Sequence, residues 1–413
     1  MTRVLLVSQY YWPESFTITS EVARLAHEGF EVTVLTGQPN YPEGRIFAGY
    51  SAFSIRQELV EGIEVIRVPL VPRGHGSGLR LILNYLSFMV SGLLIAPFIL
   101  RGRHFDVVFV FGLSPLIQAL PAILISKIKR AGLVLWVQDL WPESLSATGF
   151  VRSPVLLGIV RLTIRFIYRN CTGILVQSDA FRPPVAALSP PNAKIEYVPN
   201  SGQSFEKNAR PSDAARKLGE QIGQSFSVVF AGNLGRAQGL DTVLESLELL
   251  RDLPDVQVFL VGSGSLDVWL EQERSLRNLT MLHLPGRFDP ADMPEILLNA
   301  SALLVSLRKE EIFSLTVPSK MQTYLSVGRP IIASLDGEGA RILSEAGAGL
   351  AAPAGDPSAL ASAIRCMASL QPMERSAMGL SGQRYFDRHF APDRITALLS
   401  ENLTAAARRG MRP

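Results

Sequence analysis

Short apolar runs of strand length alternate with amphipathic segments of helix length along the chain, and this alternation constrains the fold most. The runs are continuous and rich in β-branched residues, which is typical of strands buried on both faces of a parallel sheet. We therefore predict a doubly wound α/β architecture. The predicted strands are Val4–Val7, Glu31–Leu35, Val107–Phe111, Leu133–Val137, Ile174–Val176, Ser227–Phe230, Val256–Val261, Ala302–Ser306 and Pro330–Ser334, and Ser20–Glu28 and Leu240–Leu250 are predicted helices.

The alternation occurs twice, which suits a chain of 413 residues better than one domain would. Around Pro190–Arg210 the composition turns polar and rich in proline, so we expect the linker there. The predicted domains are residues 1–200 and 201–390, followed by a helix over 391–413. Two such domains facing each other form a cleft where the carboxyl ends of the strands meet, and ligands bind at such edges.

Composition excludes several classes of function. Lys and Arg number 40 against 37 Asp and Glu, without a basic block that could follow a nucleic-acid backbone, so nucleic-acid binding is disfavoured. The two cysteines, Cys171 and Cys366, and the five scattered histidines have no metal-ligand spacing. We expect no metal and no cofactor. The first apolar run, Val4–Val7, is too short for the hydrophobic region of a signal peptide.

The segment Leu79–Leu100 is apolar and long enough to span a bilayer, which takes about 20 residues. A spanning helix is disfavoured because polar residues and Pro97 interrupt the segment, and because it lies between strands that should pair. Two interpretations remain, a helix buried in the core and a helix partly sunk into a membrane interface. The second would be flanked by basic residues, namely Arg73, Arg80, Arg101 and Arg103.

Two motifs in the second domain favour binding of a phosphorylated ligand. The strongest is a glycine-rich turn between a strand and a helix, in which backbone can approach a diphosphate and Arg236 can pair with it. In the other, Lys320 opens a helix, where a cation is unfavourable unless an anion is bound nearby. The plain alternatives are a tight turn and a surface lysine. The motifs span Phe230–Asp241 and Val317–Ile332.

Two motifs in the first domain follow predicted strands. Trp136–Ser144 carries the carboxylates Asp139 and Glu143, which could hold sugar or acceptor hydroxyls. Ser8–Glu14 is aromatic and acidic, which suits a sugar better than a phosphate. Loop capping is the plain alternative for both. A nicotinamide site is weakly supported, because the loop that begins at Gly262 does not complete the dinucleotide-binding pattern.

Taken in order, these motifs resemble those of the family 4 glycosyltransferases, and most of all the bacterial branch that includes N-acetyl-fucosamine and colanic-acid-type transferases. The resemblance covers nearly the whole chain. Its motifs are Gln9–Glu14, Gln138–Glu143, Val198–Asn200, Gly232–Gly235, Gly262–Gly264, Pro318–Lys320, Gly328–Pro330 and Gly355–Pro357.

The resemblance implies a GT-B fold of two Rossmann-like domains, with a C-terminal helix that crosses back to the first. It implies metal-free transfer with retention, in which cations and helix dipoles stabilise the leaving diphosphate. The implied catalytic residues are Arg236, Lys320 and Asp139. The implied donor-binding residues are Gly232, Asn233, Gly235, Gln238, Gly239, Gly262, Arg287, Ser319 and Glu338, and the acceptor-binding residues are Gln9, Tyr10, Tyr11, Glu14 and Glu143.

The chain departs from the family at several of its functional positions. Asn233 and Gln238 stand where the wider family has Arg and Lys, so Arg236 is expected to substitute. The paired glutamates of the family fall at Leu315 and Thr323, and its first-domain histidine falls at Gln138. These changes leave the sugar contacts open.

The resemblance implies transfer of a sugar from a UDP- or GDP-linked donor to a lipid-linked saccharide, in exopolysaccharide, capsule or O-antigen synthesis. The expected location is the cytoplasmic face of the plasma membrane, bound peripherally. Two alternatives remain, a sugar-nucleotide epimerase on the same fold and a non-catalytic relative that binds nucleotide sugar.

Overall fold

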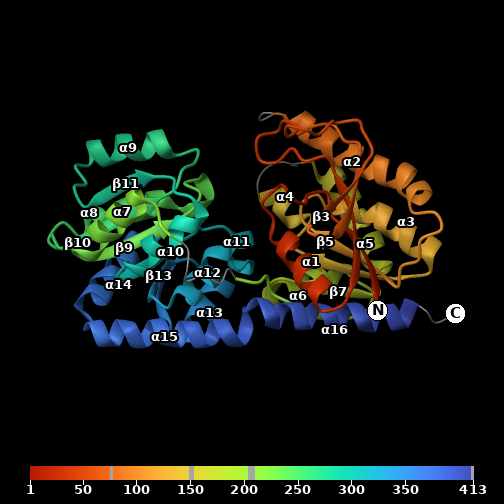
Figure 1. Cartoon of the computed structure of the whole chain (residues 1–413). Coiled ribbons are helices and arrows are strands. Elements are labelled where there is room, and N and C mark those ends of the chain that lie inside the picture. The colour runs from red at the N-terminus through yellow and green to blue at the C-terminus, as the bar shows by residue number, and fades with distance from the viewer. Residues whose placement is uncertain (75–77, 148–152, 203–209, 411–413) are drawn as a thin grey trace. The chain divides into compact units, whose positions relative to one another are not determined.

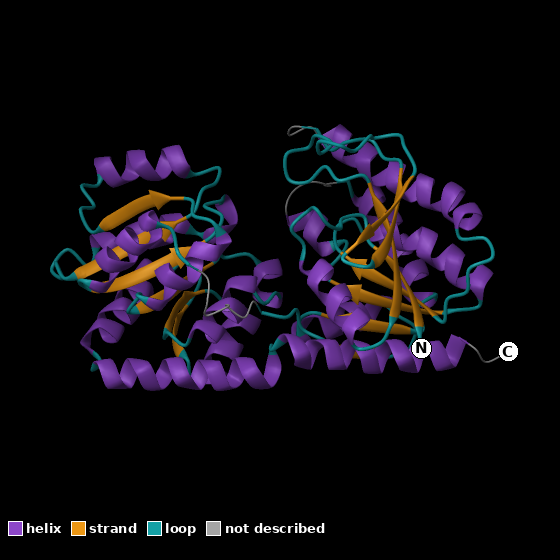
Figure 2. Ribbon diagram, in the orientation of Figure 1, coloured by secondary structure: helices purple, strands orange, loops and turns teal. Residues whose placement is uncertain are grey.

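The computed structural model describes residues 1–74, 78–147, 153–202 and 210–410. Parts of the predicted linker, 203–209, and of the predicted terminal helix, 411–413, lie outside the described residues. The chain forms two compact units, one of Met1–Asn200 with Ile395–Pro413 and one of Ser201–Arg394 (Figure 1). In each unit the strands lie side by side with helices on either face (Figure 2).

Among the described residues, the first unit holds an eight-stranded sheet in the order β3-β4-β2-β1-β5-β6-β7-β8. Every neighbouring pair is parallel except β3 and β4. The interior strands are almost wholly apolar and buried, as predicted. The strands are β1 (Arg3–Val7), β2 (Glu31–Gly37), β3 (Arg56–Val60), β4 (Ile63–Val68), β5 (Val107–Gly112), β6 (Gly132–Val137), β7 (Gly173–Val176) and β8 (Ile195–Tyr197).

The helices of the first unit connect these strands. They are α1 (Thr17–His27), α2 (Gly78–Ile99), α3 (Ala119–Lys129), α4 (Glu143–Ala147), α5 (Pro154–Arg169) and α6 (Arg182–Leu188), with 3₁₀ turns at Leu116–Gln118 and Asp179–Phe181. The segment Leu79–Leu100 corresponds to α2, which connects β4 to β5 within the sheet. By length and composition alone, α2 could cross a membrane.

The C-terminal helix α16 (Pro392–Gly410) completes the core of the first unit, as predicted. Apolar side chains at helical spacing, Ile395, Leu399 and Leu403, are fully buried against the sheet beside α1. Gly132 allows close approach, because a Cβ there would lie 2.3 Å from the carbonyl oxygen of Ala406.

The second unit, within the described residues, holds a six-stranded parallel sheet in the order β11-β10-β9-β12-β13-β14. This is the order of a doubly wound nucleotide-binding sheet. Its strands are β9 (Phe226–Ala231), β10 (Val256–Val261), β11 (Leu282–Gly286), β12 (Ala302–Ser306), β13 (Ile331–Ser334) and β14 (Gly349–Ala352).

Two apolar clusters, one on each face, bury this sheet beneath its helices. The helices are α7 (Asp213–Gly223), α8 (Leu240–Glu248), α9 (Asp267–Leu276), α10 (Met293–Leu298), α11 (Glu311–Leu315), α12 (Ser319–Val327), α13 (Glu338–Ala346), α14 (Pro357–Ser369) and α15 (Pro372–His389), with 3₁₀ turns at Arg236–Gln238 and Pro290–Asp292. Side chains cap several helix starts; for example, Asp356 accepts a hydrogen bond from Ala359 N at 2.9 Å.

Every predicted strand is present within two residues of its expected bounds. The predicted α/β architecture of two doubly wound domains is therefore confirmed. The strands without a prediction, such as β3, β8 and β14, lie toward the sheet edges and contain polar or small residues.

Candidate functional site

The carboxyl edge of the second sheet contains a topological switch point between β9 and β12. From β9 the chain proceeds through β10 to β11, and from β12 it proceeds the other way to β13 and β14. The loops after β9 and β12 therefore diverge and leave a crevice, which is where doubly wound sheets bind ligands. Arg308 N donates to Ala237 O at 2.9 Å and ties the two loops together.

The glycine-rich loop after β9 is held by backbone hydrogen bonds and leaves no room for a side chain at Gly232 or at the neighbouring Gly262. Gly232 N donates to Val261 O at 2.9 Å, and Gly262 N donates to Gly286 O at 2.8 Å. The φ angles of Gly232 and Gly262 are +136° and +144°, which L-residues rarely adopt. A Cβ at Gly262 would lie 1.9 Å from Gly232 O, so the two glycines are required for this packing.

Lys320, at the start of α12, reaches from its own helix to this loop. Its Nζ donates to Gln238 Oε1 at 2.6 Å and lies 4.3 Å from the centre of the Phe230 ring. A Cβ at Gly232 would lie 2.7 Å from Lys320 Cε. Burial lowers the pKa of Lys320 to about 8, because few groups here replace the water around the ammonium. A bound anion would supply the missing counter-charge.

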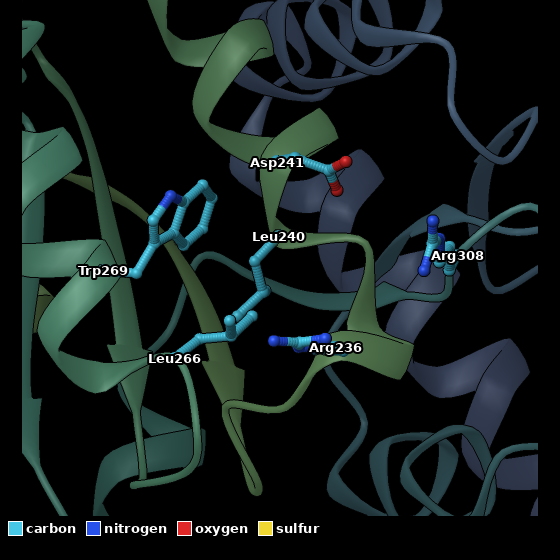
Figure 3. A pocket seen from close by; sticks show the side chains of 6 residues that line it. All are labelled: Arg236, Leu240, Asp241, Leu266, Trp269 and Arg308. Carbon is cyan, nitrogen blue, oxygen red and sulfur yellow. The ribbon is translucent and has the colours of Figure 1, made fainter.

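Arg236 lines a pocket beside the same loop. Apolar side chains from α8 and α9, Leu240 and Trp269, form one wall, and Arg308 lies on the opposite side (Figure 3). Leu266 and Asp241 also line the pocket. Sequence reasoning missed Arg308 and Trp269; the signal for Arg308 was its position two residues after a predicted strand.

The other predicted donor residues of this loop have structural partners. The Asn233 side chain packs between Gly235 and Gly264, whose added Cβ atoms would lie 2.8 and 2.7 Å from its amide group. Gly239 has a φ of +56° and begins α8 against the backbone of Leu307. These residues shape the loop, while Gln238 is joined to Lys320.

Three further predicted donor residues differ in exposure and in their partners. Ser319 is exposed at the start of α12, where Pro318 occupies the N-cap position and no side chain caps the helix. Arg287 is exposed just after β11. Glu338 is buried, and both of its oxygens accept hydrogen bonds from Arg341, at 2.6 and 2.9 Å. A ligand hydroxyl that bound the Glu338 carboxylate would therefore have to share it with Arg341.

The carboxyl edge of the first sheet carries an aromatic cluster with one arginine at its centre. Tyr10 stacks on Phe16 at 5.1 Å between ring centres, and both rings pack against Tyr41. The Arg73 guanidinium lies 5.0 Å from the Tyr41 ring centre and donates to Tyr10 Oη at 3.2 Å. No carboxylate among the described residues pairs with Arg73. It remains a cation held by aromatic rings.

Several predicted acceptor residues are buried beneath this cluster. Gln9 donates through Nε2 to Asn84 Oδ1 at 2.7 Å, and Tyr11 lies in the apolar core. Glu14 is 3% exposed and accepts from the backbone N–H groups of Tyr11, Asn40 and Tyr41, at 3.2, 2.8 and 2.8 Å. These three side chains position the loop rather than line its surface, and Tyr10 is buried as well, at 2% exposure.

The carboxyl group of Glu14 has an altered acidity. Burial raises its pKa to about 7, and the three backbone N–H donors oppose that rise. The same donors link the loop after β1 to the loop after β2, so Glu14 determines the shape of the site that Tyr10 and Arg73 form.

Asp139 lies after β6, near the same edge, where Ser114 N donates to its Oδ2 at 3.0 Å. Burial raises the pKa of Tyr85, on α2; the charge of Arg73 opposes that rise, and the charge of Asp139 adds to it. Glu143 is partly exposed at the start of α4. The sequence did not indicate Tyr41 or Tyr85, because no motif marks them, and it indicated Arg73 only as a basic residue that flanks the apolar segment.

Two families match the chain. Residues 16–201 match the family described as "Glycosyl transferase 4-like domain", and residues 225–369 match "Glycosyl transferases group 1". The chain is 27% identical over 341 residues to WcaI of Escherichia coli K12, a protein named for colanic acid biosynthesis; the match covers 79% of this chain and 81% of that protein. It is 26% identical over 316 residues to WbjE of Pseudomonas aeruginosa, named as a glycosyltransferase, covering 73% and 77%.

Solved structures share the fold over the whole length. HepE of Anabaena, in complex with UDP, superposes with a TM-score of 0.68 at 16% identity and covers 98% of this chain and 100% of its own. The same protein has been solved with UDP-glucose.

Proposed function

Because the chain belongs to the glycosyltransferases with a 4-like first domain and a group 1 second domain, built on the GT-B fold, we propose that it transfers a sugar from a UDP- or GDP-linked donor to a lipid-linked saccharide. The second unit would bind the donor and the first unit the acceptor. The product would serve a bacterial surface polysaccharide, as the name of the colanic acid relative suggests.

The observation that carries the donor assignment is the environment of Lys320. An ammonium with a lowered pKa, joined to Gln238 and covered by the glycine loop, pairs with no carboxylate among the residues that the structure describes. A nucleoside diphosphate at the loop would provide that charge, and Arg236 would add a second cation from the pocket wall. Together they would stabilise the charge that develops on the departing diphosphate. The complex of HepE with UDP favours UDP as the nucleotide.

The acceptor assignment is supported by the cluster around Arg73. The partly exposed rings of Phe16 and Tyr41 suit the face of a saccharide, and an arginine that pairs with no carboxylate among the described residues suits the phosphate of a lipid carrier. Asp139, near Tyr85 at the same edge, is the carboxylate we assign to the acceptor hydroxyl. The reaction would proceed with retention at the anomeric carbon and without a metal, as the family resemblance implies.

Calorimetric titration of the purified protein with UDP, GDP and ADP, without added metal, tests the donor site. We expect one nucleotide to bind selectively and Lys320→Ala to weaken that binding about 100-fold or more. Lys217→Ala, which removes an exposed lysine from α7 of the same unit, is the matched control and should bind as the wild type does. Equal affinity in Lys320→Ala and wild type would refute the assignment.

A further inference from the structure

Helix α2 presents most of its apolar surface to the outside. Its buried positions form a stripe four residues apart, Asn84, Phe88, Gly92 and Ala96. Only 22% of its apolar window is buried, so the interpretation as a buried core helix does not hold. The exposed apolar residues of α2 are Leu79, Ile82, Leu83, Leu86, Val90, Leu94 and Phe98, and Phe98 is 77% exposed.

Helix α5 also exposes apolar side chains, although its sequence did not suggest contact with a membrane. Its buried residues, Ile164, Ile167 and Tyr168, lie in its C-terminal half. The exposed side chains are apolar as well, with Val155 at 73% and Leu162 at 65% exposure. The other exposed apolar residues of α5 are Leu156, Ile159 and Phe166.

Helix α3 packs against both α2 and α5. Gly92 of α2 lets the helices approach closely, because a Cβ there would lie 2.9 Å from the ring of Pro121. At the other end of α3, Lys127 Nζ lies 6.0 Å from the centre of the Phe166 ring of α5. The exposed residues of α2 and α5 therefore belong to one group of packed helices.

The charges on these three helices have one sign. The segments Gly78–Ile99, Ala119–Lys129 and Pro154–Arg169 contain no Asp or Glu, although the chain has 37 of them. Their charged residues are Arg80, Lys127, Lys129, Arg161, Arg165 and Arg169. A second copy of this basic face would be repelled by it, whereas an anionic surface would be attracted.

We propose that α2 and α5, joined by α3, form a docking surface for an anionic lipid bilayer. The exposed leucine, isoleucine, valine and phenylalanine side chains enter the interface, and the arginines bind lipid headgroups. The inference rests on the proposed function for the lipid-linked acceptor. It adds α5 as the second contact, so that two helices fix the orientation of the first unit on the membrane.

The position of the docking surface relative to the acceptor cluster agrees with this role. Helix α2 begins five residues after Arg73, at the carboxyl edge of the sheet. The Arg80 side chain packs over Gly74, where a Cβ would lie 2.6 Å from Arg80 Cδ. A lipid phosphate at the bilayer surface would thus lie at the same end of α2 as Arg73.

Sedimentation of the full chain with vesicles tests the surface. We expect binding to phosphatidylcholine vesicles that contain phosphatidylglycerol, weaker binding to phosphatidylcholine alone, and loss of binding in high salt. The double variant Ile159→Gln/Leu162→Gln should bind about tenfold less or worse, because two apolar side chains no longer enter the interface. The matched control, Val268→Gln/Leu276→Gln, changes two exposed residues of α9 and should bind as the wild type does.

The charge-reversed variant Arg161→Glu/Arg165→Glu should lose the preference for phosphatidylglycerol while keeping the fold. Wild-type vesicle binding by the α5 variants would overturn the proposal. So would a dimer in light scattering that the Ile159→Gln/Leu162→Gln change dissociates, since the face would then cover a second copy. UDP titration of the same samples separates the two proposals: UDP binding without vesicle binding overturns only the docking surface, and vesicle binding without nucleotide binding overturns the donor site.

Discussion

At the scale of single residues, the proposed donor site depends on Lys320, whose pKa is lowered by burial. Because the pKa of Lys320 is about 8, the side chain loses its proton just above neutral pH in the free protein. A bound diphosphate favours the protonated form, so nucleotide binding and proton uptake are coupled.

We therefore expect the affinity for UDP to fall as the pH rises through 8. At about pH 9 roughly one-tenth of Lys320 remains protonated, so affinity should fall about tenfold, whereas Lys320→Arg should bind UDP with little pH dependence over this range. Calorimetry between about pH 7 and pH 9 measures both. A flat wild-type profile would mean that Lys320 does not contact the diphosphate.

Gly232 provides a second test at this scale. In Gly232→Ala the new methyl group would crowd Lys320 Cε at 2.7 Å, at a φ of +136°. We expect a loss of about 1–3 kcal/mol in stability and a large loss of UDP affinity. Gly29→Ala is the control, because Gly29 has a φ of +90° but no atom within 4 Å of an added Cβ. It should lower the Tm without changing UDP binding; equal UDP affinity in Gly232→Ala would contradict the proposed role of the loop.

The site residues that could be inferred from the sequence differ from those that could not in how the fold brings them together. Gly232 and Gly262 directly follow strands whose apolar pattern is strong, so their place at the sheet edge could be inferred, and Lys320 could be inferred from its unfavourable position in the first turn of a helix. Arg73 and Tyr41 become neighbours only through the folding of two loops, and the spacing of residues in the sequence does not predict that contact. The partners of buried side chains could not be inferred either: Glu14 and Tyr10 belong to one motif and are both buried, yet Glu14 accepts hydrogen bonds from backbone N–H groups and Tyr10 accepts one from Arg73.

At the scale of elements, strands could be predicted better than the environment of helices. Continuous apolar runs specify a buried strand wherever they occur, as in β1, β5 and β6. Helical periodicity shows which face is apolar, but it does not show whether that face meets the sheet. For α5 the apolar residues divide between the core and the outside, and only the packing of α3 and α6 against the helix reveals which are which.

Helix α16 allows a test at this scale. Leu399 is fully buried against the first sheet, so Leu399→Ala should destabilise the protein by about 2–5 kcal/mol. Leu380→Ala removes the same atoms from an exposed position on α15 and should change stability by less than about 0.5 kcal/mol. Urea unfolding followed by tryptophan fluorescence reports the difference, because Trp136 lies in the same cluster as Leu399. Equal midpoints for the two variants would show that α16 is not needed by that core.

At the scale of the whole molecule, the two units differ in how their chain segments are assembled. The second unit is one continuous segment, Ser201–Arg394, with an apolar cluster on each face of its sheet. The first unit combines Met1–Asn200 with α16, so its core includes residues from two distant parts of the chain.

We expect residues 201–394 expressed alone to fold and to bind UDP within about tenfold of the affinity of the full chain. Residues 1–200 alone should aggregate, because the face that α16 covers would expose an apolar surface. Circular dichroism, light scattering and calorimetry of the two fragments check this. A stable, monomeric fragment 1–200 would show that α16 is dispensable for the first unit.

The return of α16 to the first unit also orders events during translation. The ribosome delivers residues 1–200 first, then the whole of the second unit, and only afterwards the segment that closes the first core. The unit that is synthesised first is therefore completed last, and the second unit can fold while the core of the first is still open. A premature stop anywhere before residue 395 would leave a nascent chain with an unfinished first unit, a product that cellular proteases can recognise by its exposed core.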